Sequence, residues 1–121
     1  MSPEALLSLA RDILSRPEFG IEGVWPRTAA FLGRQSLESA LDQHWEASLP
    51  QMRYATRATQ LACIDQFVKD AVVVDGVRTA WSALSRVCHH HPYELSPTAA
   101  ELEMWLAKVD GLVNELKTPV G

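Results

Sequence analysis

The chain has few cysteines, no excess of positive charge and no long apolar run, and each absence excludes a class of protein. Its 121 residues contain only two cysteines, too few for a disulfide framework. The net charge of −4 excludes a global basic field, so a role with nucleic acid would need a local positive patch. No uninterrupted apolar run approaches the length that spans a bilayer.

The first residues also lack a cationic segment ahead of their apolar positions, so a secretory signal is not expected. We therefore expect a cytoplasmic protein with no membrane partner. In that compartment Cys63 and Cys88 should be reduced thiols that pack as small apolar residues. The sequence shows no internal repeat and no low-complexity tract, which predicts a single domain over residues 1–121.

Apolar residues recur at helical spacing between the prolines and glycines that punctuate the chain. In the first half this predicts helices over residues 3–15, with Ser2 as the cap, over 26–48, and over about 52–69. Residues 70–76 hold three successive valines and are predicted as a loop or a helix start, because an isolated strand has nothing to pair with.

Helical spacing continues from Val77 to Cys88, and a last helix precedes Pro119. That helix begins either at Ser96-Pro97 or at a capping box formed by Thr98 and Glu101. The sequence therefore predicts an all-α antiparallel bundle of four to five helices.

The predicted core consists of the apolar residues that share one face of each helix. They are Leu37, Leu41, Trp45, Leu61, Ile64, Trp81, Leu84, Leu102, Trp105, Leu106, Val109 and Leu112. The small residues Ala29, Ala30, Gly33 and Ala40 would allow another helix to cross the second helix closely.

The segment from Arg86 to Tyr93 concentrates the reactive side chains of the chain: one arginine, one cysteine, three histidines and one tyrosine. Arginine is a permanent cation that holds phosphate or carboxylate, and histidine titrates near neutral pH. The segment lies at the junction before the last helix, and such exposed junctions often bear functional residues.

Two kinds of site are disfavoured for this segment. Consecutive residues on a helix diverge by about 100°, so His89, His90 and His91 cannot all face one metal ion, and we expect no metal site. Cys88 next to a histidine does not form a catalytic thiol–imidazole pair for the same reason.

Arg86 and His91 favour phosphodiester chemistry without a metal or another cofactor. If the helix unwinds before Pro92, the guanidinium can hold two phosphate oxygens while the imidazole activates a ribose 2′-hydroxyl. The alternative is that Arg86 is an ordinary surface residue, that the histidines form a polar turn, and that Tyr93 anchors the loop by packing.

The spacing Arg86, four residues, His91, one residue, Tyr93 resembles the Arg-x4-His-x-Tyr motif of HEPN-domain proteins, in particular the toxins of HEPN/minimal-nucleotidyltransferase pairs. Residues 29–41 also resemble the second helix of that family, where a small-residue stretch with a glutamine leads to an acidic residue, here Glu38. The stretch from Tyr93 to Pro97 is similar to the link that follows the family motif.

The resemblance implies an all-α bundle that forms a homodimer and cleaves RNA as a metal-independent endoribonuclease, a toxin or defence protein. It implies that Arg86 and His91 are catalytic, with His89, His90 and Glu38 in support. It further implies that Tyr93 is the residue that a nucleotidyltransferase antitoxin modifies.

A second interpretation stays open beside the nuclease. The position after the motif arginine is commonly asparagine in the family, and it is Val87 here. An acidic net charge also suits a non-catalytic helical interaction module, a HEPN-like adaptor that binds a protein or a nucleotide.

Overall fold

The computed structural model describes residues 1–16, 25–89 and 96–117, and every regular element in them is a helix. The all-α fold predicted from the sequence is confirmed. No helix in this part of the chain is both long enough and apolar enough to cross a bilayer. The elements are α1 (Pro3–Ser15), α2 (Trp25–Ser48), the 3-10 helix η2 (Pro50–Tyr54), α3 (Arg57–Cys63), the 3-10 helix η3 (Ile64–Gln66), α4 (Ala71–Cys88) and α5 (Ala99–Lys117).

Local capping explains where three of these helices begin. The Ser2 hydroxyl accepts the backbone N–H of Ala5 at 3.1 Å and starts α1, as predicted. Asp70 caps α4 in the same way, so the three valines that follow it form the first turns of a helix. Thr98 and Glu101 form a reciprocal capping box, which decides between the two predicted starts of α5.

The predicted helix over residues 52–69 is wrong, because the chain breaks it into three shorter pieces. Ala55 is extended, with φ −83° and ψ 156°, and ends η2. The Thr56 hydroxyl then accepts the N–H of Thr59 at 3.1 Å, which starts α3 only at Arg57. The apolar residues between 52 and 69 keep a helix-like spacing because 3-10 turns also place residues three apart on one side.

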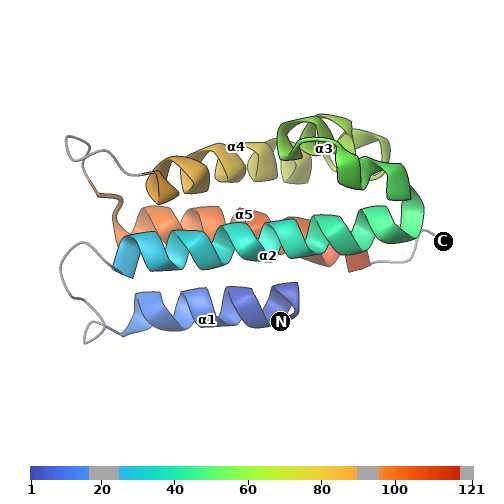
Figure 1. The fold of residues 1–121 in the computed structure, drawn as a ribbon. Coiled ribbons are helices and arrows are strands. Elements are labelled where there is room, and N and C mark those ends of the chain that lie inside the picture. The colour runs from blue at the N-terminus through green and yellow to red at the C-terminus, as the bar shows by residue number, and fades with distance from the viewer. Residues whose placement is uncertain (17–24, 90–95, 118–121) are drawn as a thin grey trace.

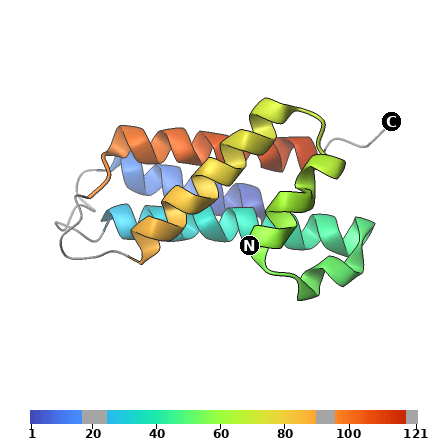
Figure 2. The same ribbon diagram turned by 90° about the horizontal axis from the view of Figure 1, so that it is seen from above.

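In chain order, each long helix runs opposite to the one before it, so the predicted antiparallel arrangement is confirmed (Figure 1). α2 and α5 lie side by side, with α1 on one side of the pair and α4 on the other (Figures 1 and 2). α4 crosses the pair diagonally, and its C-terminal end lies beside the N-terminal half of α2 (Figure 2).

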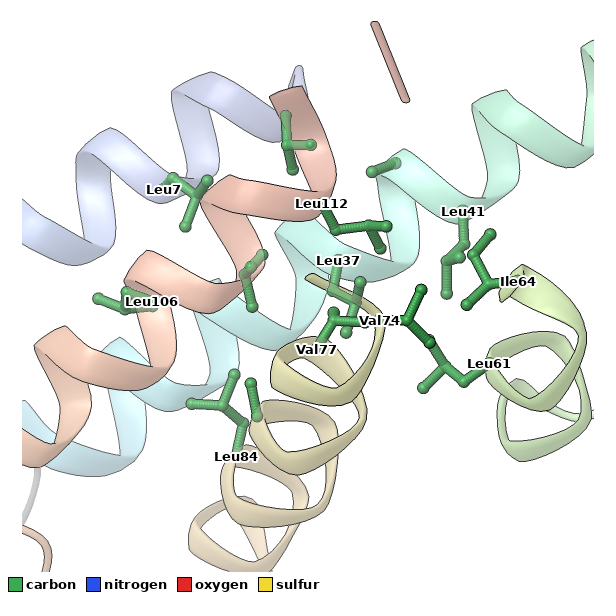
Figure 3. Close-up of a cluster of buried hydrophobic side chains, with 14 of the residues drawn as sticks. Leu7, Leu37, Leu41, Leu61, Ile64, Val74, Val77, Leu84, Leu106 and Leu112 are labelled. Atoms are coloured by element: carbon green, nitrogen blue, oxygen red, sulfur yellow. The ribbon is translucent and has the colours of Figure 1, made fainter. Parts of the chain in front are cut away.

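The core lies between α2, α4 and α5 and extends to α1 and α3 (Figure 3). All of the predicted core residues are buried except Trp81 and Trp105, which are only partly buried. Burial of this apolar surface is the main favourable contribution to folding, at about 25 cal/mol per Å².

The small residues of α2 are buried within the bundle of the same molecule. A Cβ atom at Gly33 would collide with Cδ2 of Leu106 on α5, so α2 and α5 cross in close contact at this point. Ala29 and Ala30 are fully buried as well. These residues therefore serve the contact between helices of one molecule and do not offer a surface for a second copy.

Candidate functional site

Arg86 lies in the last turn of α4 and its side chain is exposed. The helix ends at Cys88, and His89 has left the helical conformation, with φ −103° and ψ 46°. The His89 N–H still donates to the Ser85 carbonyl at 3.1 Å, which is the last hydrogen bond of α4. The other predicted site residues, His90, His91 and Tyr93, lie outside the described residues.

The Arg86 guanidinium makes no ion pair or hydrogen bond with any residue that the structure describes. The exposed guanidinium has five N–H donors. The end of α4 therefore presents an anion-binding group to the solvent.

Glu38, predicted to support Arg86 and His91, is engaged elsewhere. Its carboxylate accepts Arg34 Nε at 3.2 Å and lies 3.4 Å from an Arg57 nitrogen. Cys88 faces these α2 residues, since the charges of Arg34 and Glu38 reach its thiol. Arg86 is two residues earlier on α4 and points nearly the opposite way, so the structure does not bring Glu38 and Arg86 together.

Arg57 is the centre of a polar network that the sequence did not predict. One guanidinium nitrogen donates to Asp42 at 2.7 Å and to the Gln60 amide oxygen at 2.9 Å. Burial works against the Arg57 cation, but the hydrogen bond and charge of Asp42, together with Glu38, raise its pKa above the ordinary value. The network joins α3 to α2.

Gln60 connects this network to the backbone of residues 52 and 55. Its side chain is only 1 % exposed, and its amide nitrogen donates to the carbonyls of Met52 at 2.8 Å and Ala55 at 3.2 Å. Every polar atom of the Gln60 amide thus has a partner, which is what burial of an amide requires. The network has a structural role, because it holds η2 and the start of α3 against α2.

A second cluster lies where α2 meets the C-terminal half of α4. The Arg34 guanidinium sits over the Trp81 ring, 4.7 Å from its centroid, while its Nε is held by Glu38. Burial raises the pKa of the Cys88 thiol, and the charges of Arg34 and Arg27 oppose that shift. A thiol with a raised pKa is less often the nucleophilic thiolate at neutral pH.

Part of this arrangement could have been found in the sequence. Arg34 and Glu38 are four residues apart on a helix, a spacing at which opposite charges commonly pair. Nothing local indicated that Arg57 would reach Glu38 and Asp42, since those partners are 19 and 15 residues away.

Among the described residues, no three side chains of the metal-ligating types His, Cys, Asp and Glu are grouped so that they could hold an ion. Comparison with family models, with curated proteins and with solved structures finds no match to this chain.

Proposed function

We propose that this protein is a HEPN-like endoribonuclease that cleaves RNA without a metal, with Arg86 and His91 as the catalytic pair. One observation carries the proposal. The Arg86 guanidinium is exposed and unengaged by the described residues at the end of α4, where the helix stops before it reaches His91.

The point at which α4 ends matters because Arg86 and His91 are five residues apart in the sequence. On a continuous helix, residues five apart point about 140° away from each other and could not act on one phosphate. α4 ends at Cys88 and His89 is already non-helical, so the chain is released from that constraint three residues after Arg86. This supports the convergence of Arg86 and His91 that the sequence motif suggests.

The proposed reaction uses only groups of the protein and the RNA. Arg86 holds the two non-bridging oxygens of the phosphate with parallel hydrogen bonds. His91 accepts the proton of the 2′-hydroxyl, and the 2′-oxygen attacks phosphorus. The 5′-oxygen of the next nucleotide leaves and takes that proton from the His91 imidazolium. The products end in a 2′,3′-cyclic phosphate and a 5′-hydroxyl.

The proposal includes a homodimer and a toxin or defence role. Two copies of the chain would bring their two motifs to one cleft. An RNA strand would bind in this cleft as the substrate. A nucleotidyltransferase antitoxin is the second partner that we propose, with Tyr93 as its target. A nucleotide on the Tyr93 phenol would place negative charge beside the Arg86 guanidinium and repel a phosphodiester.

Cleavage of a labelled single-stranded RNA by the full chain in EDTA tests this function. Wild type should cleave, while Arg86→Ala and His91→Ala should each be slower by about a hundredfold or more. Arg53→Ala is the matched control, because Arg53 is also an exposed arginine but lies in η2. Light scattering on the same samples should give twice the 13.4 kDa mass of one chain.

A DNA strand that contains a single ribonucleotide should be cut only on the 3′ side of that ribonucleotide, because only the ribose has a 2′-hydroxyl. Mass spectrometry of the fragments should detect the cyclic phosphate. Activity that disappears in EDTA and returns with a divalent ion would contradict the mechanism, and full activity in both variants would place the site elsewhere.

The alternative proposal is a non-catalytic adaptor with the same helical bundle. The position of Glu38 favours it, because Glu38 is bound to Arg34 and Arg57 and so adds no acidic group to the motif. An adaptor would bind its ligand through the end of α4 and show no cleavage in the assay above.

A further inference from the structure

We propose that the surface where the N-terminal half of α2 meets the C-terminal half of α4 binds single-stranded RNA. We call it the α2–α4 face, and it consists of Arg27, Phe31, Arg34 and Trp81. The exposed Phe31 ring would stack on a base, the arginines would contact phosphates, and Trp81 would support the Arg34 guanidinium. The identity of the ligand rests on the proposed function, while the surface itself is argued from the following contacts.

Three residues of the α2–α4 face share one stripe of α2. Arg27, Phe31 and Arg34 are spaced by four and three residues, the spacing that aligns side chains on a helix. Phe31 is 50 % exposed although it is a large apolar ring on a helix whose other face is fully buried. An exposed ring beside arginines is the combination on which single-stranded nucleic acids stack their bases.

Trp81 on α4 provides the second ring. It is only partly buried, and the Arg34 guanidinium lies over it at 4.7 Å from the centroid. Glu38 fixes the guanidinium by accepting its Nε at 3.2 Å. The guanidinium is held beside the ring, and a guanidinium can contact a phosphate and a base plane together.

The local charge suits a nucleic acid although the whole chain is acidic. Farther along α2, Arg57 is balanced by Asp42 and Glu38. Toward the start of α2, Arg34 is paired with Glu38, whereas Arg27 is exposed and makes no ion pair with the residues that the structure describes. A local basic patch with interleaved aromatic rings, set in a chain of net charge −4, is typical of a surface that binds single strands.

The position of this face connects it to the motif. The C-terminal end of α4 lies beside the N-terminal half of α2 (Figure 2). Arg86 is in the last turn of α4, on the side turned away from α2. A strand that lies along the α2–α4 face therefore runs toward the end of the bundle where Arg86 is exposed. Only a single strand has bases free to stack on Phe31.

Fluorescence anisotropy with a labelled, fully 2′-O-methylated uridine 12-mer tests binding without cleavage. Phe31→Ala should weaken binding by about fivefold or more, the lower end of the effect of losing one base–aromatic stack. Arg27→Ala should lower the slope of log affinity against log salt by about 0.7, the value for one phosphate contact on a single strand.

Two variants serve as controls. Met104→Ala removes an equally exposed apolar side chain, 51 % exposed, from α5, and Arg53→Ala removes an exposed arginine from η2. Both should bind as wild type. Circular dichroism should show that every variant keeps the helical fold.

The outcomes separate this surface from the proposed nuclease. If wild type cleaves RNA, while Phe31→Ala and Arg27→Ala bind and cleave like wild type, the α2–α4 face is wrong and the nuclease stands. If those two variants lose binding but wild type cleaves nothing, the face stands and the nuclease fails. No binding by wild type would overturn the face and point to a protein partner for Phe31.

Discussion

At the scale of single residues, Gly33 sets the distance between α2 and α5. A Cβ atom there would meet Cδ2 of Leu106, the end of a flexible side chain, and would lie 3.5 Å from Cδ1 of Leu84. Gly111 on α5 is the opposite case, because a Cβ atom there would have nothing within 4 Å. The two glycines therefore separate the effect of helix propensity from the effect of packing.

Gly111→Ala should raise the free energy of unfolding by about 0.5–1 kcal/mol, because alanine loses less conformational entropy in a helix than glycine does. Gly33→Ala should gain the same free energy of unfolding from helix propensity. Overpacking against Leu106 should lower the free energy of unfolding by about 1–3 kcal/mol, so this variant should be less stable than Gly111→Ala. Urea denaturation of both variants measures the difference. Equal stabilisation by the two substitutions would show that Leu106 adjusts without cost.

A buried polar contact also acts at this scale. The Ser36 hydroxyl is fully buried and donates to the Pro3 carbonyl at 2.6 Å. The carbonyl of Pro3 is thereby satisfied by a side chain of α2. This bond fixes the first turn of α1 on α2, in addition to the apolar contacts of Leu7.

At the scale of elements, α4 shows how a cap decides between helix and strand. Its first turn contains Val72, Val73 and Val74, and valine prefers strands over helices. The Asp70 carboxylate accepts the backbone N–H of Val72 at 3.0 Å and of Val73 at 3.4 Å. Two of the unpaired donors at the helix start are thus satisfied, which stabilises the helical conformation.

Asp70→Ala should therefore lower the free energy of unfolding by about 0.5–2 kcal/mol. Asp70→Asn is the matched control, because asparagine caps a helix about as well as aspartate without the charge. Thermal denaturation followed by circular dichroism measures both. Loss of stability in the asparagine variant as large as in the alanine variant would assign the effect to charge and contradict capping.

At the scale of the whole molecule, the end of α2 packs on the chain after α3. The rings of His44, Trp45 and Phe67 meet edge to face, with centroids 4.7–5.2 Å apart. Burial in this cluster lowers the pKa of His44 below its ordinary value of 6.5. The unfolded chain therefore binds a proton at this position more readily than the folded one.

Because the unfolded state takes up that proton, stability is fully present above the unfolded pKa and falls as the pH drops through 6.5 toward the lower folded pKa. Urea midpoints at about pH 7.5 and pH 5 should show this loss for wild type. His44→Gln should show a smaller loss over the same interval. An identical loss in the variant would mean that other groups cause it.

The sequence by itself determined most helix boundaries. Apolar spacing marked four of the five α-helices, and the caps Ser2 and Thr98 lie within three residues of the N–H groups that they accept. Such contacts depend on neighbours along one helix, so a single sequence contains all the information needed. The prediction failed between residues 52 and 69, where the helix is broken by turns of similar periodicity.

Only the tertiary structure decided which side chains meet across helices. Glu38 pairs with Arg57 and not with Arg86, and Trp81 is shared between the core and a contact with Arg34. Gly33 of α2 faces Leu106 of the same chain. The physical reason is the same in each case: the partner depends on how α4 and α5 cross α2, and that angle follows from the packing of the whole core.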